Sequence, residues 1–193
     1  MQIGFYFDQT RCTGCSACRV ACKDWHDIPA GPANWRRLGA LEEGQWPDLF
    51  VAYSTSSCYH CAEPPCVPAC PVGAITKLAE NGIVVVDREV CLGWDKCGGA
   101  CLMACPYDAP QFRGAENNPK MEKCDLCLER WQEGKKPICV EACPTRALDA
   151  GPLEELRSAY GDCREGKLFA YNASSEPSVN FKPKRCPVKQ VYG

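Results

Sequence analysis

Residues 12–22 read CTGCSACRVAC and place four cysteines at the spacing C-x2-C-x2-C-x3-C. The first three thiols fall within seven residues, close enough to curl around one compact inorganic group. The fourth follows on a predicted helix and points away from the others, so it must serve a second group. The stretch therefore predicts a fold organised around shared metal centres.

The other cysteines form three further clusters of four along the chain. Group one is Cys12, Cys15, Cys18 and Cys22; group two is Cys58, Cys61, Cys66 and Cys70; group three is Cys91, Cys97, Cys101 and Cys105; group four is Cys124, Cys127, Cys139 and Cys143. Groups two and four follow C-x2-C-x4-C-x3-C-P and C-x2-C-x11-C-x3-C-P, so each widens one gap and keeps the final x3-C. Only Cys163 and Cys186 lie outside the groups, and we expect both to be ordinary thiols.

Three of the groups end in the same phrase, C-P-x-x-A. It occurs as CPVGAI at 70–75, CPYDAP at 105–110 and CPTRAL at 143–148. Such a recurrence is an internal repeat. Its proline removes a backbone donor and fixes φ, which predicts a sharp exit from each cysteine loop.

Iron–sulfur clusters explain these spacings better than zinc or disulfide bonds do. Zinc sites use pairs such as C-x2-C separated by a dozen or more residues. Group four alone could pass for such a site, but group one packs its third and fourth cysteines too tightly. Disulfide bonds are disfavoured by the crowding and by an N-terminus without the basic and apolar segments of a signal peptide. Sixteen grouped cysteines at four ligands each predict four clusters.

The composition leaves little apolar material for a core. Of 193 residues 18 are cysteines, and removing them from the hydrophobic 46% leaves about 37%. Cluster ligation is the expected source of the missing stability, because ligation energy becomes folding energy when no site exists in the unfolded chain. The net charge of −2, without a basic stripe, argues against nucleic acid as a partner. No apolar run approaches the ~18 residues of a membrane span.

The pattern of apolar residues predicts a mixture of short strands and helices. Strands are expected at 3–7 and 83–86, and helices at 18–25, 125–134 and 152–160. The segment 30–47, rich in Gly, Pro and Trp, is predicted to be a packed loop, and the chain from Cys163 onward to be extended and irregular. The repeated order of strand, cysteine loop, helix and strand is typical of α+β ferredoxin-like units.

The chain resembles the four-cluster iron–sulfur subunits of the dimethyl sulfoxide reductase family. That family includes the electron-transfer subunits of dimethyl sulfoxide, polysulfide and thiosulfate reductases and of some formate dehydrogenases. The matching stretches are FDQTRCTGCSACRVACKD at 7–24, CYHCAEPPCVPACPVGA at 58–74, CPYDAPQ at 105–111 and KCDLCLERWQEGKKPICVEACPTRAL at 123–148. The likeness covers roughly residues 3–157.

The resemblance implies that the clusters form between groups. Cys12, Cys15 and Cys18 would take Cys143, and Cys22 would join Cys124, Cys127 and Cys139. Cys58, Cys61 and Cys66 would take Cys105, and Cys70 would join Cys91, Cys97 and Cys101. The implied α+β fold has two nested bacterial-ferredoxin-like units, residues 1–28 plus 120–160 and residues 52–115. Residues 29–51 would be a loop-rich insertion and residues 161–193 an extended C-terminal arm.

Group three departs from the family pattern, which expects C-x2-C-x2-C-x3-C-P. Here the spacing is C-x5-C-x3-C-x3-C-P, and Trp94 stands where a second cysteine would fall. Related nitrate-reductase subunits carry Trp there and hold a [3Fe-4S] cluster. Because Cys97 and Cys101 leave no ligand missing, we expect four [4Fe-4S] clusters, with a three-iron cluster at group three as the alternative.

The function implied is that of a non-catalytic electron-transfer subunit in an oxidoreductase complex. Its partners would be a large molybdenum- or tungsten-pterin catalytic subunit and, at the other end, a quinone-reactive membrane anchor or another redox protein. The rival reading is a free-standing polyferredoxin that serves several oxidoreductases. The protein would stay in the cytoplasm or be exported with a signal-bearing partner, peripheral to the membrane if an anchor exists. The segment after Cys163 is expected to bind the partner.

A few residues outside the ligand set invite an interpretation. His60 is expected on a surface loop. Lys123 and Lys120 could raise the potential of the cluster at Cys124, since nearby charge sets potential, or could lie on a solvated face. Four tryptophans are expected to pack or to meet a subunit: Trp25, Trp35, Trp46 and Trp131.

Overall fold

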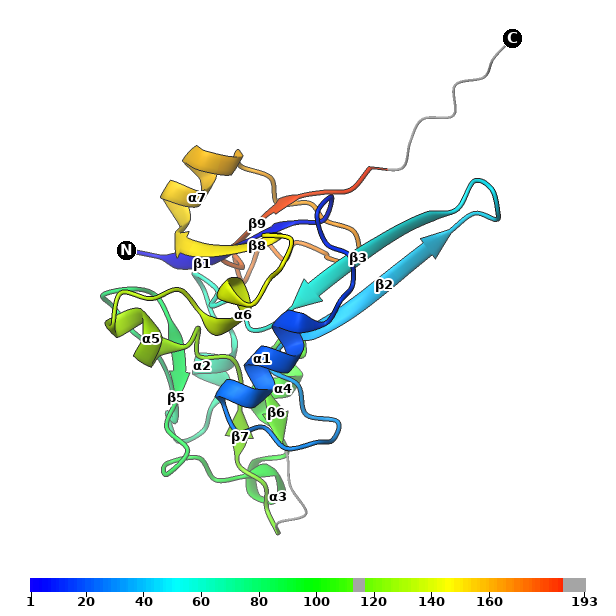
Figure 1. Ribbon diagram of the computed structural model, residues 1–193. Helices are drawn as coiled ribbons and strands as arrows, with labels where there is room; N and C mark the ends of the chain where they lie inside the picture. The colour runs from blue at the N-terminus through cyan, green and yellow to red at the C-terminus, as the bar shows by residue number, and fades with distance from the viewer. Residues whose placement is uncertain (113–116, 186–193) are drawn as a thin grey trace.

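The computed structural model describes residues 1–112 and 117–185, so Cys186 lies outside the described residues. A three-stranded sheet lies at one end of the molecule, and short helices and two-stranded ribbons fill the rest (Figure 1). This mixture confirms the predicted α+β class.

The sheet has β1 (Ile3–Asp8) as its central strand. β1 pairs antiparallel with β8 (Leu148–Pro152) and parallel with β9 (Val179–Lys182). The predicted strand at 3–7 is therefore confirmed, and its whole length is buried. Helix α7 (Leu153–Tyr160), the predicted amphipathic helix, packs against this sheet. The ring of its Tyr160 stacks on the ring of Tyr6, with the two centroids 3.9 Å apart.

Three helices surround groups one and four. They are α1 (Ala17–Trp25), which confirms the prediction, α5 (Leu128–Gln132) and α6 (Ile138–Glu141). α5 is shorter than the predicted 125–134 because Leu126 and Cys127 take left-handed conformations, at φ 62° and 50°, which a helix cannot include. No helix among the described residues is long and apolar enough to cross a bilayer.

Groups two and three lie in a second set of short elements. In chain order these are α2 (Cys66–Ala69), β4 (Ile75–Lys77), β5 (Val84–Val86), α3 (Trp94–Cys97), α4 (Ala100–Ala104), β6 (Gln111–Phe112) and β7 (Met121–Glu122). β4 pairs with β5, which confirms the predicted strand at 83–86, and β6 pairs with β7. Each C-P-x-x-A phrase runs within two residues into a strand: β4, β6 or β8.

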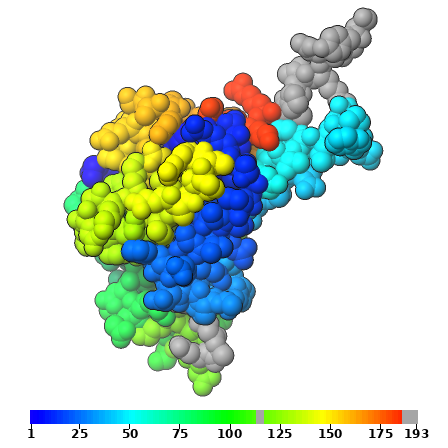
Figure 2. All heavy atoms as spheres, viewed as in Figure 1, coloured from blue at the N-terminus to red at the C-terminus, as the bar shows by residue number. Residues whose placement is uncertain are grey.

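Residues 37–47 of the segment predicted as a packed loop instead form the first strand and part of the turn of a β-hairpin, whereas residues 30–36 are irregular as predicted. Strands β2 (Arg37–Glu43) and β3 (Phe50–Ser56) pair antiparallel along their whole length. The hairpin projects from the body of the molecule in Figure 2. The prediction was wrong because β2 has little apolar alternation of its own and is held by its pairing with the more apolar β3.

The C-terminal segment is extended, as predicted, but it is part of the folded body up to residue 185. β9 completes the central sheet, Phe181 is 1% exposed, and the main-chain groups of Ser178 bond to both Tyr59 and Phe5. Residues 164–185 are therefore ordered by contacts with this chain's own core. The expectation that the segment after Cys163 binds the partner stays a prediction.

The core itself contains many of the cysteines. One buried cluster combines Phe5, Phe7 and Phe181 with cysteines of groups two and four, and a second combines Ile75 and Val84 with cysteines of groups two and three. Thiols thus occupy places that a protein of this size would usually give to Leu or Ile. The stability of the core therefore depends on what those thiols bind.

Candidate iron–sulfur cluster sites

Two small cavities are each lined by the four cysteines of one implied set. Cys58, Cys61, Cys66 and Cys105, here called set C, line one of them. Cys70, Cys91, Cys97 and Cys101, here called set D, line the other. The remaining walls are mostly Pro, Val, Ala and aromatic side chains. Groups two and three, separate in sequence, therefore interleave in space.

The cysteines of groups one and four also meet, as their mutual electrostatic effects show. Burial raises the pKa of Cys12, and the charges of Cys18, Cys143 and Cys15 raise it further. These four are here called set A.

Set B comprises Cys22, Cys124, Cys127 and Cys139. Burial raises the pKa of Cys127 to about 12, and the charges of Cys139 and Cys22 add to this effect. Burial likewise raises the pKa of Cys124 well above its usual range, with Cys22 adding to it.

Set D has four cysteines although Trp94 stands at the position where the family pattern has a cysteine. Cys97 and Cys101 both line its cavity, whereas the Trp94 ring lies edge-on against Phe112 at 5.1 Å. A Cβ on Gly99 would lie 2.3 Å from the Trp94 ring, and Gly99 is left-handed at φ 66°. The Gly98–Gly99 pair thus lets the backbone turn past the tryptophan and bring Cys101 to the others.

The repeated C-P-x-x-A phrase is a turn that directs a backbone donor at the cysteine sulfur. The N–H of Ala74, Ala109 and Ala147 donates to Sγ of the cysteine four residues earlier, at 3.3, 3.5 and 3.2 Å. Each alanine is at most 5% exposed, so a larger side chain has no room there. Hydrogen bonds to sulfur are one means by which a protein sets cluster potential.

The turn requires a left-handed residue before the alanine. The three copies have Gly73 at φ 65°, Asp108 at φ 49° and Arg146 at φ 53°. Only the first is glycine, the residue that adopts this conformation without strain. The other two copies carry that strain.

We expect Gly73→Ala to destabilise the holoprotein and Arg146→Gly to stabilise it, each by about 1 kcal/mol. A Cβ at residue 73 would meet no atom within 4 Å, so its cost is conformational alone. The measurement is the guanidinium concentration at which half the cluster absorbance is lost anaerobically after a fixed time. Equal shifts of the same sign in both variants would contradict the shared turn.

The three C-x2-C loops share a second left-handed position, directly before their second cysteine. It is occupied by Gly14, His60 and Leu126, at φ 73°, 45° and 62°. His60 is fully buried, so its predicted surface position is wrong. Its Nδ1 accepts the Val84 N–H at 3.0 Å, and its burial, with the charges of Lys123 and Arg36, lowers its pKa well below the usual range. A buried neutral histidine cannot be told from a surface one by its loop position alone.

Two buried cations lie beside the cysteine sets. Lys123 is 2% exposed, lines the set C cavity and donates to the carbonyls of Val84 and Cys124. Arg36 is 3% exposed, and its Nη2 has no hydrogen-bond partner among the described residues. Lys120, by contrast, is on the surface near Glu89. Sequence reasoning considered Lys123 but missed Arg36, which no motif marks.

The donor sets fit a four-cysteine cluster. Each set has four thiols, and in every set a main-chain N–H group donates to a cysteine sulfur. The two buried cations beside the sets, Arg36 and Lys123, have no carboxylate within ion-pair distance among the described residues. Charged groups are buried in this way only when opposite charge compensates them. Anionic clusters would supply that charge.

A histidine side chain also reaches set B. His26 Nε2 lies 3.3 Å from Cys127 Sγ and 3.8 Å from Asp125, and its ring packs on Trp35 at 4.5 Å. Trp35 therefore packs inside this chain, as one of its two predicted roles required. Trp46, in contrast, is 88% exposed. Cys163 lies apart from all four sets and donates from its sulfur to the Glu165 carbonyl.

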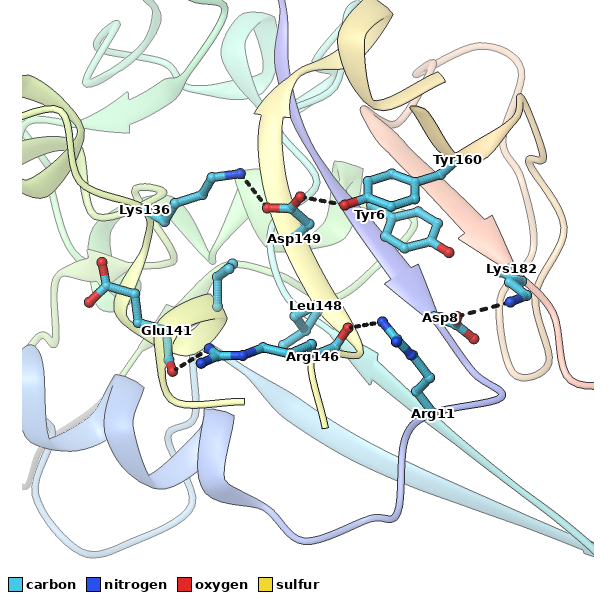
Figure 3. A pocket seen from close by; sticks show the side chains of 11 residues that line it. Tyr6, Asp8, Arg11, Lys136, Glu141, Arg146, Leu148, Asp149, Tyr160 and Lys182 are labelled. Carbon is cyan, nitrogen blue, oxygen red and sulfur yellow. Dashed lines mark hydrogen bonds and ion pairs between the residues drawn. The ribbon is translucent and has the colours of Figure 1, made fainter. Parts of the chain in front are cut away.

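A wider cavity of about 560 Å³ contains no cysteine in its lining and is polar (Figure 3). Its charged groups pair with one another: Lys136 with Asp149, which also accepts the Tyr160 hydroxyl, and Lys182 with Asp8. Arg11 and Arg146 each donate to a main-chain carbonyl. It is distinct from the cysteine sites in chemistry.

Comparison with known proteins identifies the family. Models of the 4Fe-4S dicluster domain match residues 49–153 and residues 11–75. The B subunit of the anaerobic dimethyl sulfoxide reductase of Haemophilus influenzae is 42% identical over 95% of this chain and 90% of its own length. Its Escherichia coli counterpart is 43% identical over 94% and 89%, and protein NrfC of Escherichia coli is 33% identical over 100% and 83%.

Two dicluster matches agree with four clusters and with [4Fe-4S] as their type. The predicted cofactors and the predicted electron-transfer role are thus confirmed. This protein belongs to the 4Fe-4S dicluster family and, within it, to the iron–sulfur electron-transfer subunits of the dimethyl sulfoxide reductase family.

Proposed function

We propose that sets A, B, C and D are the ligands of the four clusters. The observation that carries this assignment is the lining of the set C and set D cavities, each of which contains four cysteines from two groups. The mutual effects within sets A and B support the same division. On this assignment residues 1–28 plus 120–160 and residues 52–115 are two nested ferredoxin-like units.

We infer that the sets follow one another in the order A, B, C, D. Burial is the largest effect that raises the pKa of Cys18 of set A; the charge of Arg36 lowers this pKa, and the charge of Cys139 of set B raises it. Burial is likewise the largest effect that raises the pKa of Cys124 of set B, and the charge of Cys58 of set C adds to it. Helices α2 and α4 each lead from one cysteine of sets C and D to the other set. Such an order gives electrons one continuous route through the protein.

The chain itself would perform no chemistry on a substrate. A four-cysteine cubane supplies one-electron redox chemistry and has no open iron site. The residues position the thiols, keep them dry and supply hydrogen bonds and charge. We propose that substrate chemistry belongs to a large catalytic subunit with a molybdenum- or tungsten-pterin, as the family resemblance implies. A quinone-reactive membrane anchor is proposed at the other end of the route.

On this proposal the protein works in the cytoplasm or is exported with a signal-bearing partner, and it is peripheral to the membrane where an anchor subunit exists. The experiment is native anaerobic purification. We expect a larger protein that contains molybdenum or tungsten to co-purify. Recovery as a monodisperse monomer without either metal would favour the free-standing polyferredoxin.

The β2–β3 hairpin supports a partner of this kind. Trp46 at its tip is 88% exposed and Leu49 is 48% exposed, although interfaces rather than free surfaces are where tryptophan is enriched. We expect Trp46→Ala to weaken co-purification of the catalytic subunit at least ~10-fold while leaving the iron content unchanged. The exposed neighbour Gln45→Ala is the control and should have no effect. Unchanged association of the Trp46 variant would exclude the hairpin tip from the interface.

Set D should hold a four-iron cluster despite Trp94. The anaerobic oxidised protein should then show no electron paramagnetic resonance signal, because an oxidised cubane is diamagnetic. A three-iron signal at about one spin per chain in that sample would refute Cys70, Cys91, Cys97 and Cys101 as a complete set. Repeating the measurement after brief exposure to air provides the positive control for such a signal.

A further inference from the structure

Arg36 is a buried guanidinium without a carboxylate partner. It is 3% exposed, and no Asp or Glu among the described residues lies within ion-pair distance of it. Its Cζ lies 4.5 Å above the Phe5 ring, Nη1 donates to Thr55 Oγ1 at 3.3 Å, and Nη2 is without a partner in the described part of the chain. Burying such a charge is strongly unfavourable unless negative charge lies close by.

The negative charge available to Arg36 comes from cysteines of two sets. Burial alone would lower the pKa of Arg36, but the thiolates of Cys139, Cys124, Cys18 and Cys22 raise it above its usual value. The first, second and fourth of these belong to set B, and Cys18 belongs to set A. The main-chain N–H of Arg36 also donates to the Cys22 sulfur. Thr55, which accepts from Arg36, has its hydroxyl 4.0 Å from Cys18 Sγ. The residue thus lies at the junction of two sets.

A fixed cation at this junction has a defined redox consequence. A four-cysteine cubane is anionic, and its negative charge grows by one when it accepts an electron. A buried positive charge therefore favours the reduced form more than the oxidised form. The effect is strong here because little water is present to screen it.

We propose that Arg36 is a positioning residue that raises the reduction potentials of the clusters in sets A and B together, and that of set B more. The proposal rests on the ligand sets proposed above. Set B is the more affected because Arg36 itself donates a main-chain hydrogen bond to the sulfur of Cys22, whereas it reaches Cys18 of set A only through Thr55. Arg36 thereby favours the reduced form of two neighbouring centres at once.

The test is a redox titration of the anaerobic holoprotein, followed by electron paramagnetic resonance, with iron counted in the same sample. Arg36→Gln should reduce the equilibrium constant for reduction of the set B cluster at least tenfold, which is 59 mV for a one-electron couple. Set A should shift in the same direction by less, and set D should not shift. Arg36→Lys keeps the charge, so the potentials of the set A and set B clusters in that variant should lie close to those of the wild type.

Two controls separate charge from disturbance of the fold. Arg37→Gln removes the neighbouring arginine, whose side chain donates to the Tyr107 carbonyl, and should leave sets A and B unchanged. Lys123→Gln removes the buried cation beside set C and should shift set C instead. Equal shifts of all four clusters in Arg36→Gln, or no shift in set B, would overturn the proposal.

If Arg36→Gln fails to assemble its clusters, the same titration is made on Arg36→Met, which removes the charge and keeps an apolar stem beside Phe5. The set B potential should then fall as expected for Arg36→Gln, while that of set D is unchanged. An unchanged set B potential in that variant would overturn the proposal. Should wild-type iron fall short of four clusters, the ligand assignment fails and not the role of Arg36, which makes the two failures distinguishable.

Discussion

Removing iron and sulfide from the anaerobic holoprotein is expected to unfold the chain. The physical reason is that the cysteines are part of the core: Cys58, Cys124, Cys139 and Cys143 lie in one buried cluster, and Cys66 and Cys101 in the other. The apolar residues other than cysteine make up only about 37% of the sequence, after its 18 cysteines are subtracted from the hydrophobic 46%.

Two further features make the cluster-free fold unstable. Arg36 and Lys123 would be buried without compensating charge, and burying an unpaired charge costs several kcal/mol. A domain is stable by only ~5–15 kcal/mol, so these two losses are comparable to the whole margin. Metal ligation of this kind commonly separates a folded holoprotein from an unfolded apoprotein.

Far-ultraviolet circular dichroism and hydrogen exchange, measured before and after iron removal with a chelator, test this expectation. The starting material should contain about 16 iron and about 16 acid-labile sulfide per chain. Loss of the spectrum of the folded state should parallel loss of iron. An apoprotein that keeps its protected amides in β1 would show that the polypeptide core is sufficient by itself.

The second large effect is expected from Cys22→Ser. Cys22 is 5% exposed on α1, and its sulfur would be shared with cysteines more than a hundred residues away. Its replacement should cost about four iron per chain, and the lost cluster should be the one next to Cys124 and Cys127. The matched control is Cys163→Ser together with Cys186→Ser, which should leave iron content unchanged.

Iron analysis and electron paramagnetic resonance of both variants decide the outcome. Equal iron loss in the double variant and in Cys22→Ser would show that the ligand set is wrong. Loss of the cluster next to Cys12 in Cys22→Ser, with that next to Cys124 retained, would show that Cys22 belongs to its own group.

The four cysteine groups and the number of clusters followed from spacing alone because ligand geometry is local, whereas the division of the cysteines into sets came from the family resemblance. Three cysteines within seven residues have few ways to fold, and the C-P-x-x-A phrase encodes its own turn. The strand at β1 and the helices α1 and α7 were predicted correctly for a similar reason, since their apolar patterns are set by near neighbours.

What the sequence did not reveal depends on contacts between distant segments. β2 is held by β3, and β9 is held by β1 more than 170 residues earlier, so neither strand has a strong pattern of its own. His60 is buried because Ser178 and Gln2 bond to its carbonyl from two other segments. Arg36 stands between sets that only the tertiary fold brings together.

The most direct test of the central claim, that this protein carries electrons through four cubanes, is a coulometric titration of the anaerobic, fully oxidised protein. Each [4Fe-4S] cluster accepts one electron, so we expect uptake of about four electrons per chain. Uptake of about two or fewer by fully iron-loaded protein, or none at all, would contradict it.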